Sequence, residues 1–298
     1  MKETVITEKA QRIDLHMHTA VSDGTDTPEE IISRVRTAGI GLFAVTDHDA
    51  LRGCEDILAA LTLDDPVFLT GVEFSCRDEE GKYHILGYGY DPKTEPIRKV
   101  AALGHSYRMD KVKARLLFLE TQFGFHFPEH DVEALLALPN PGKPHIGNLM
   151  VKYGYARSKE EAIRDYINKL RFRSEYVRPE EAVRGILEGG GIPVLAHPIY
   201  GSGEELILGD EMEHRLCRLM DFGLQGVEAC YSGFTRKLRE QMLSLAARYG
   251  LYVTAGSDYH GANKLVALGD TGLGGPDDWP EGLKRFLEDV HRENRYEI

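Results

Sequence analysis

The 298-residue sequence contains no apolar run near the roughly 20 residues that a membrane-spanning helix requires. It also lacks the apolar segment of a secretory signal, because its first twelve residues (MKETVITEKAQR) are mostly polar or charged. Four cysteines lie far apart and form no Cys-x-x-Cys pair: Cys54, Cys76, Cys217 and Cys230. We therefore expect reduced thiols in a cytoplasmic protein without a membrane partner, and we exclude a disulfide-stapled secreted scaffold.

Basic residues are scarcer than acidic ones. The sequence contains 36 Lys and Arg and 48 Asp and Glu, so its net charge is −12. This balance argues against extended nucleic-acid binding, because contact with a phosphate backbone needs a basic surface. It still allows a small anion to be held at one local site. The charge is uneven, because residues 97–180 contain 15 basic and 10 acidic side chains. A basic segment in an acidic chain predicts two surfaces with different functions.

Strand and helix patterns alternate in two parts of the chain, whose length fits either two domains or one α/β barrel. Seven segments have the apolar character of strands: 12–18, 41–46, 66–74, 83–90, 193–196, 226–230 and 251–256. Helix-start signals stand between them, such as the capping box Thr27-Pro28-Glu29-Glu30. The alternation predicts a mainly parallel sheet covered by helices.

Residues 97–180 interrupt this alternation, because they show helical spacing and no strong strand pattern. We expect one helix over 101–123 and another from Ser158 to about Leu170. The sequence therefore predicts an α/β part formed by residues 1–96 and 181–298. Residues 97–180 are predicted to be inserted into it as a helical segment.

Histidine and carboxylate side chains gather at the ends of the predicted strands. In a β/α barrel the strand ends meet on one face, where active sites lie. The histidines of His16-Met17-His18 leave the same side of an extended chain, so they can bind one ion together. His, Asp and Glu are ligands of divalent metals. Nine such residues predict a site for more than one ion: His16, His18, Asp23, His48, Glu73, His84, His197, Asp258 and His260.

Each of these residues also has an ordinary structural interpretation when it is taken alone. A single His-x-His pair is equally consistent with core or surface histidines, and His197 before Pro198 is typical of a turn. Glu73 fits a pairing with a buried arginine. The metal interpretation is favoured because all nine residues coincide with predicted strand ends.

Together these motifs resemble the polymerase and histidinol phosphatase (PHP) superfamily. The motifs that carry the resemblance are His16-x-His18 with Asp23, Thr46-Asp47-His48-Asp49, Glu73, His84, Ala196-His197-Pro198 and Ser257-Asp258-x-His260. The resemblance covers nearly the whole chain. It implies a distorted seven-stranded (β/α)7 barrel that binds three divalent ions at the ends of its strands.

The resemblance also implies which residues bind each ion, and we expect the ions to be Mn²⁺, Fe²⁺ or Zn²⁺. The first ion is assigned to His16, His18, Glu73 and Asp258. The second is assigned to Asp23, His48 and His260, and the third to Glu73, His84 and His197, so that Glu73 bridges two ions. Asp47 and Asp49 are expected to orient His48. Glu228 has no place in this scheme and is interpreted as structural or as lying near the rim.

The implied activity is that of a metal-dependent phosphoesterase. The positive charge of three divalent ions would exceed the negative charge of their three carboxylate ligands. A hydroxide and a phosphate dianion would balance this excess positive charge. The expected mechanism is in-line attack on phosphorus by a metal-bridging hydroxide. That hydroxide would be held by Asp23, His48, Glu73, Asp258 and His260.

Within this fold, residues 1–96 and 181–298 are expected to form the barrel, and the basic insertion of residues 97–180 is expected to form a small helical cap that contacts the substrate. Arg108-x-x-Lys111 and Lys143-Pro144-His145 resemble segments with which one PHP subgroup contacts substrate phosphates, so Arg108, Lys111, Lys143 and His145 are candidate substrate-binding residues. That subgroup removes the 3′-phosphate of nucleoside 3′,5′-bisphosphates or trims short 5′-phosphorylated RNA. Lysine replaces arginine at two of these positions, which removes the bidentate contact of a guanidinium and leaves the exact substrate open.

Three other functions agree with parts of the sequence. A histidinol-phosphate phosphatase shares the fold and the metals, but the helical insertion argues mildly against it. A metal-dependent amidohydrolase also begins with His-x-His, yet it normally has a bridging lysine at a strand end, where this chain has none. A metal-stabilised regulatory PHP module without activity is disfavoured by the complete ligand set. The sequence does not indicate an oligomeric state.

Overall fold

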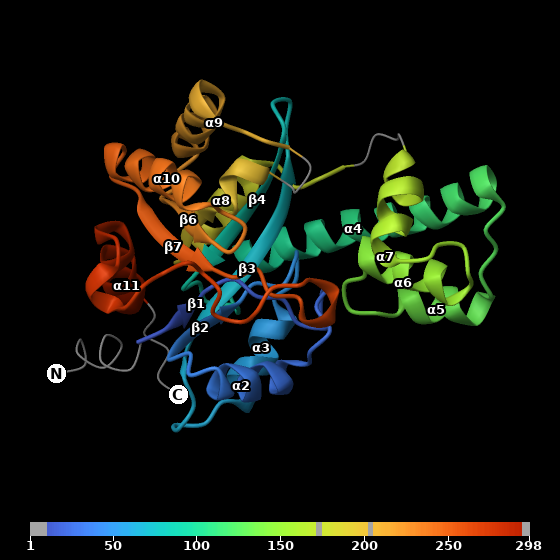
Figure 1. Cartoon of the computed structure of the whole chain (residues 1–298), viewed down its shortest axis with the longest axis horizontal. Helices are drawn as coiled ribbons and strands as arrows, with labels where there is room; N and C mark the ends of the chain where they lie inside the picture. The colour runs from blue at the N-terminus through green and yellow to red at the C-terminus, as the bar shows by residue number, and fades with distance from the viewer. Residues whose placement is uncertain (1–10, 171–174, 202–204, 294–298) are drawn as a thin grey trace.

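The computed structural model describes residues 11–170, 175–201 and 205–293, and a seven-stranded sheet lies at its centre (Figure 1). Its strands are neighbours in chain order: β1 (Ile13–Asp14), β2 (Leu42–Val45), β3 (Val67–Arg77), β4 (Lys82–Tyr88), β5 (Ile192–Leu195), β6 (Gly226–Tyr231) and β7 (Tyr252–Gly256). The two edges meet, because the Leu15 amide donates to the Ala255 carbonyl at 2.9 Å and Met17 pairs with Tyr259. This nearly closed barrel confirms the predicted fold class.

One strand departs from the parallel arrangement. β4 runs antiparallel to both β3 and β5, whereas the other neighbouring strands are parallel. Residues 78–81 alone separate β3 from β4, and a parallel crossover needs about a dozen residues or more. The reversal brings the first residues of β4, including His84, to the end of the barrel where its parallel neighbours finish.

Helices cover the outside of the barrel (Figure 1). They are α2 (Pro28–Thr37), α3 (Arg52–Ala60), α8 (Pro179–Glu188), α9 (Gly209–Asp221), α10 (Arg236–Arg248) and α11 (Glu281–Glu293). The predicted capping box is confirmed, because the Glu30 amide donates to Thr27 Oγ1 at 3.3 Å and the Thr27 amide donates to Glu30 Oε2 at 2.8 Å. Among the helices that the structure describes, none has both the length and the apolar character to cross a membrane.

A helical region between β4 and α8 projects from the barrel (Figure 1). It contains α4 (Glu95–Phe123), α5 (Glu129–Leu136), α6 (Lys143–Lys152) and α7 (Lys159–Glu161). The first turns of α4 bury Ile97 and Val100 in the barrel core, whereas Val112 and Leu119 belong to a separate apolar cluster. One helix thus joins two cores. We propose residues 97–180 as a cap whose first turns are anchored in the barrel.

The helix expected from Ser158 to Leu170 is less regular than its sequence pattern suggests. Ser158 caps its start, since the Glu161 amide donates to Ser158 Oγ at 3.2 Å. The α-helical part ends at Glu161 and is followed by a π-helical turn over Ala162–Tyr166 and a 3-10 turn over Ile167–Lys169. The wider turn accompanies the burial of Ala162 and Ile167 in the second apolar cluster.

Candidate metal centre

The nine residues predicted to bind metals converge at one end of the barrel. Loops after the strands carry most of them, while β3 and β4 themselves carry Glu73 and His84. All are buried except His84 and His260, which are partly exposed. Their ligand atoms form four overlapping groups, and within each group these atoms lie within 4.8 Å of one another.

Glu73 lies at the middle of this constellation. Its Oε2 atom is 3.2 Å from His18 Nε2 and 3.1 Å from His48 Nδ1. Its Oε1 atom is 2.9 Å from His84 Nδ1 and 3.1 Å from His197 Nε2. The two carboxylate oxygens therefore face different sets of histidines.

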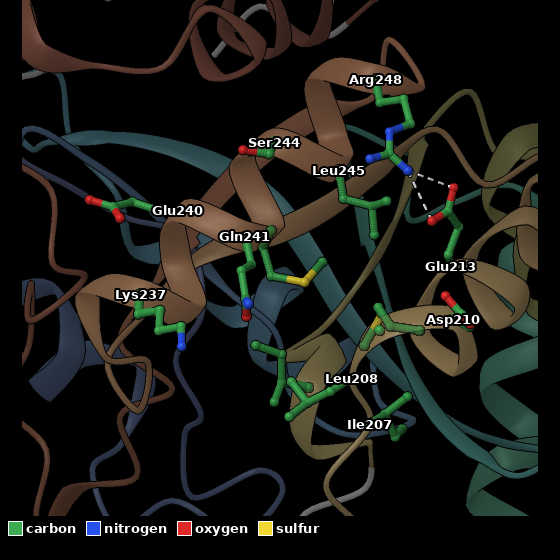
Figure 2. Close-up of a pocket in the computed structure, with 14 residues that line it drawn as sticks. Ile207, Leu208, Asp210, Glu213, Lys237, Glu240, Gln241, Ser244, Leu245 and Arg248 are labelled. Carbon is green, nitrogen blue, oxygen red and sulfur yellow. Dashed lines mark hydrogen bonds and ion pairs between the residues drawn. The ribbon is translucent and has the colours of Figure 1, made fainter.

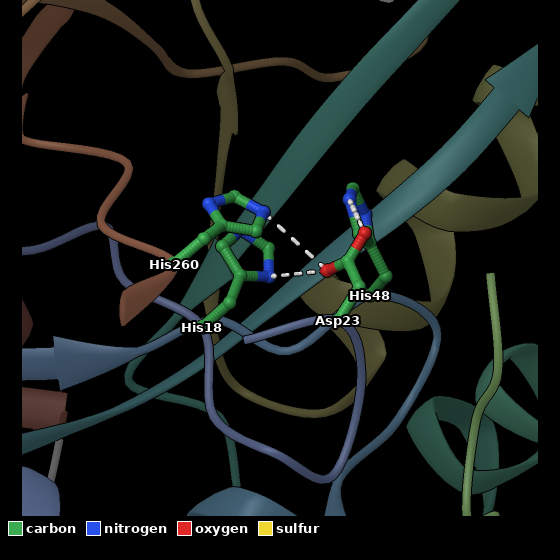
Figure 3. A group of neighbouring side chains, drawn as sticks. All are labelled: His18, Asp23, His48 and His260. Atoms are coloured by element: carbon green, nitrogen blue, oxygen red, sulfur yellow. Dashed lines mark ion pairs between the residues drawn. The ribbon is translucent and has the colours of Figure 1, made fainter. Parts of the chain in front are cut away.

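A second group surrounds Asp23 (Figure 3). Asp23 Oδ1 lies 3.4 Å from His260 Nε2 and 3.7 Å from His18 Nδ1, and Asp23 Oδ2 lies 3.9 Å from His48 Nε2. The three residues assigned from the sequence to the second ion are therefore close together. His18, which was assigned to the first ion, also takes part in this group.

The residues assigned to the first ion also lie close together. His16 Nε2 and His18 Nε2 each lie 3.5 Å from Asp258 Oδ1, and His16 Nε2 is 3.5 Å from Glu73 Oε2. Tyr231 donates its hydroxyl hydrogen to Asp258 Oδ2 at 2.9 Å, and Lys264 pairs with the same oxygen. Sequence analysis did not identify Tyr231 or Lys264, because neither carries a metal-ligand pattern.

The charges within the centre are strongly coupled. Although burial opposes ionisation, the surrounding histidines hold the pKa values of Asp23, Glu73 and Asp258 well below their usual range. Burial likewise opposes charge on His18, yet the carboxylates of Asp258 and Glu73 raise its pKa to about 9. Buried carboxylates beside histidines form a site whose negative charge a cation would neutralise.

The donor set fits divalent metals. It consists of imidazole nitrogens and carboxylate oxygens, which suit Mn²⁺, Fe²⁺ and Zn²⁺. Among the described residues, His48 Nδ1 and His197 Nδ1 are buried and make no hydrogen bond, although His48 Nδ1 lies 3.1 Å from Glu73 Oε2. Buried polar atoms normally have partners, so these nitrogens indicate sites prepared for another group.

The backbone around the centre is held in an uncommon conformation. Asp49, His197 and Asp258 have φ angles of 49°, 24° and 58°, and no other described non-glycine residue has a positive φ. Such conformations cost about 1–3 kcal/mol each and concentrate at functional sites. Two of the three residues are predicted metal ligands, so the backbone strain lies where metal binding is predicted.

Asp47 holds the loop between His18 and Asp23. Its carboxylate accepts hydrogen bonds from the Thr19 amide at 2.9 Å, the Thr19 hydroxyl at 2.7 Å and the Ser22 hydroxyl at 2.6 Å. Its expected part in orienting His48 stays a prediction.

Asp49 connects the barrel to α4. It accepts hydrogen bonds from the Ser75 amide at 2.9 Å and from Arg108 Nε at 3.3 Å. Its expected part in orienting the ring of His48 stays a prediction. The His48 carbonyl accepts a hydrogen bond from the Asn140 side chain, which is a second contact between the insertion and the metal centre.

Glu228 was interpreted from the sequence as structural or as lying near the rim, and its buried position agrees with a structural role. It lies fully buried within β6 and contacts both His16 and His197, so it belongs to the interior of the centre and not to its rim. The available signal was a single carboxylate in the otherwise apolar strand GVEAC. An acidic side chain buried in a strand needs a partner, and here the partners are two predicted ligands.

A cavity of about 260 Å³ lies over the predicted ligands and is also lined by Tyr200, Asn263 and Lys264. A second cavity of about 280 Å³ shares Asp23, His48, His84 and Pro144 with it. Basic side chains line this second cavity, hereafter the basic cavity: Lys82, Arg108, Lys111, Arg115 and Lys143. The metal centre is therefore continuous with a cationic space beneath the insertion.

Three of the four predicted substrate-binding residues line the basic cavity. Arg108 donates to Ser75 Oγ at 3.3 Å, and Lys111 places its Nζ 3.5 Å from the centre of the Tyr176 ring. Lys143 lies at the first turn of α6. His145 is not among the lining residues, and its Nδ1 accepts a hydrogen bond from the Gly142 amide at 3.1 Å.

A larger cavity lies away from the metal centre (Figure 2). It measures about 430 Å³ and is formed by α9, α10 and the segment before α9, with apolar residues such as Leu208 and Leu245. Arg248 and Glu213 pair across its edge at 2.8 Å. None of the nine predicted ligands lines this larger cavity. The candidate site is therefore the smaller cavity over the His, Asp and Glu side chains.

Comparison with known proteins gives relatives along most of the chain. A nucleoside 3′,5′-bisphosphate phosphatase from Chromobacterium violaceum is 31% identical over 83% of this chain and 87% of its own. A 5′-3′ exoribonuclease from Haemophilus influenzae is 26% identical over 87% and 93%. A phosphoribosyl 1,2-cyclic phosphate 1,2-diphosphodiesterase from Eggerthella lenta is 32% identical over 83% and 94%.

The fold is shared with solved structures. A protein from Bifidobacterium adolescentis, assigned as a metal-dependent phosphoesterase, has a TM-score of 0.80 and 29% identity, covering 94% of this chain and 96% of its own. The family model of the PHP domain matches residues 14–173. Together with the His, Asp and Glu groups at the barrel end, these matches show that the chain belongs to the PHP domain family and is a metal-dependent phosphoesterase.

Proposed function

We propose that this protein hydrolyses phosphate esters of nucleotides. The substrate would be the 3′-phosphate of a nucleoside 3′,5′-bisphosphate or the first linkage of a short 5′-phosphorylated RNA. The observation that carries this proposal is the continuity between the metal centre and the basic cavity. One phosphate would lie at the metals while a second contacts the cations beneath the insertion.

Three divalent ions, chosen from Mn²⁺, Fe²⁺ and Zn²⁺, are proposed to occupy the centre. His16, His18, Glu73 and Asp258 would hold the first, Asp23, His48 and His260 the second, and Glu73, His84 and His197 the third. The two-sided contacts of the Glu73 carboxylate support its bridging role. When bound, such ions lower the pKa of water and stabilise negative charge on phosphate oxygens.

The side chains of the insertion are proposed to recognise the second phosphate. Arg108 and Lys111 are three residues apart on α4 and therefore lie on the same side of the helix. Asp49 holds the Arg108 guanidinium, which lines the basic cavity, through an ion pair at 3.3 Å. His145 holds the start of α6 through Gly142, so we propose that it positions Lys143. Charge-assisted contacts to phosphate are the strong class of hydrogen bond.

A screen with Mn²⁺ that measures released phosphate and, for the RNA, released nucleoside 5′-monophosphate tests this function. Its substrates would be a nucleoside 3′,5′-bisphosphate, the matching nucleoside 3′-monophosphate, a short 5′-phosphorylated RNA, histidinol phosphate and a ribosyl 1,2-cyclic phosphate. We expect kcat/KM for the bisphosphate to exceed that for the 3′-monophosphate by roughly 10-fold or more, because the second phosphate gains a charge-assisted contact. Equal values for these two substrates would refute recognition of a second phosphate.

A further inference from the structure

Both carboxylate oxygens of Glu228 are used within the metal centre. Glu228 Oε1 lies 2.9 Å from His16 Nδ1, and Glu228 Oε2 accepts the amide hydrogen of His197 at 2.8 Å. The side chain is fully buried in β6, which supplies none of the nine predicted ligands. One carboxylate thus connects the ligand after β1 with the ligand after β5.

The contact with His16 fixes the orientation and tautomer of its ring. When Nδ1–H donates to a carboxylate, the lone pair lies on Nε2. His16 Nε2 is the nitrogen that faces Glu73 and Asp258, at 3.5 Å from each. The ring is therefore held with its metal-binding nitrogen directed into the centre.

The contact with His197 holds a strained backbone. His197 has a φ of 24°, which a residue other than glycine rarely adopts. The hydrogen bond from its amide to Glu228 fixes the start of this turn, after which His197 Nε2 reaches Glu73 Oε1 at 3.1 Å. The same carboxylate thereby supports ligands on two sides of Glu73.

The neighbouring strand is shaped to accommodate this arrangement. A Cβ atom on Gly256, in β7, would lie 2.5 Å from Glu228 Oε1 and 2.2 Å from the Cβ of His16. Any larger residue would therefore displace one of the two partners. The close approach of three strands around one buried carboxylate needs glycine at this position.

We propose that Glu228 is a positioning residue that holds His16 and His197 together and thereby couples the first and third ion sites. It acts through the two histidines, because its oxygens face His16 Nδ1 and the His197 amide and not the His16 Nε2 atom that is directed into the centre. This role rests on the ion sites proposed above but not on the substrate proposed above.

The test uses the full chain, stripped with a chelator and reloaded with Zn²⁺ or Mn²⁺. In Glu228→Gln the amide oxygen can still accept from His197, but the amide nitrogen would face His16 Nδ1 and force the ring proton onto Nε2. We expect the metal affinity of one class of site to fall by roughly 10- to 100-fold. The metal affinity of the remaining sites should stay unchanged. Metal stoichiometry and competition titrations measure this difference.

Two controls separate positioning from a general effect on folding. Thr254→Val changes a fully buried residue paired with Glu228 across the sheet, and it should leave metal affinity unchanged. In a His16→Ala background, Glu228→Gln should cause little further loss at the site that His16 serves, as a double-mutant cycle requires for coupled residues. Wild-type affinity and stoichiometry in Glu228→Gln would overturn the proposal. So would full additivity with His16→Ala.

Discussion

Lys159, in the insertion, donates hydrogen bonds from Nζ to the main-chain carbonyl of Asn263 at 2.6 Å and to its side-chain oxygen at 3.1 Å. Asn263 in turn donates from Nδ2 to the carbonyl of Asp23 at 2.9 Å. The insertion therefore contacts the loop after β7 as well as the loop after β2, where Arg108 meets Asp49. These contacts fix it over the metal centre at two separate places.

Lys159→Ala should loosen the insertion over the centre. We expect KM for a bisphosphate substrate to rise about 2- to 5-fold, as loss of roughly 0.5–1 kcal/mol from the two hydrogen bonds to Asn263 would produce. Hydrogen exchange should increase in α7 and in residues 261–264. Lys152→Ala is the matched control, because Lys152 pairs with Asp131 inside the insertion. Identical exchange in the two variants would contradict a fixing role for Lys159.

Arg108→Ala should lower kcat/KM for a 3′,5′-bisphosphate by roughly 10- to 150-fold, since a hydrogen bond to a charged group contributes about 1.5–3 kcal/mol. Hydrolysis of p-nitrophenyl phosphate should change little, because that substrate reaches only the metals. Lys113→Ala on the exposed side of α4 serves as the control. Metal content must stay constant in both variants. If kcat/KM falls equally on both substrates, Arg108 acts on the metal centre through Asp49 and does not bind the second phosphate.

Lys111 should make substrate binding sensitive to pH. Burial lowers its pKa to about 7, so its positive charge is present below pH 7 and is lost as the pH rises above it. We expect KM for a bisphosphate to rise between pH 7 and 9 in the wild type. Lys111→Arg should flatten this rise, because arginine remains charged over the whole range. A KM profile that is the same in both proteins would exclude Lys111 from phosphate binding.

Glu73→Gln should impair the centre more than His84→Ala does. The carboxylate faces histidines of more than one ion group, so its neutralisation removes charge from each of them. We expect a lower metal stoichiometry and a loss of turnover beyond the roughly 10- to 100-fold that removal of a supporting residue causes. Metal analysis and turnover must be measured on the same sample. Normal stoichiometry with near-normal turnover would remove Glu73 from the bridging position.

Metal binding should release protons at pH 8. The pKa of His18 is raised to about 9 by Asp258 and Glu73 against the effect of burial, so the metal-free ring is still protonated at this pH. A divalent ion must displace that proton, and metal affinity should therefore fall as the pH falls from 9 towards 7. Calorimetry in buffers of different ionisation enthalpy measures the release. Binding without proton release at pH 8 would contradict this assignment.

The sequence predicted much of the centre because its ligands follow apolar strands in short motifs. His16, His48 and His197 each come directly after such a strand, and strands that converge bring these positions together. The antiparallel course of β4 was not predicted, because alternation of side chains does not encode strand direction. The short connection of residues 78–81 was the available evidence for a hairpin.

The contacts that support the predicted ligands and their loops were harder to predict from the sequence. Glu228 and Asp47 are acidic residues whose partners lie 31 or more and 25 or more positions away in the chain, so no local spacing links them. Asp49 is adjacent to His48, which favoured that residue as its partner. Its contact with Arg108 was not anticipated, because Arg108 comes from a helix whose direction only the packing of α4 on the barrel determines.

The insertion between paired strands has a consequence for biosynthesis. Tyr88 at the end of β4 pairs with Ile192 at the start of β5, so the barrel closes only after the whole insertion has been made. At roughly 5–20 residues per second, several seconds pass between synthesis of the last early ligand, His84, and of His197. During this interval the nascent chain carries six candidate ligands without the remaining three. We therefore expect correct metal loading to follow release of the finished chain from the ribosome.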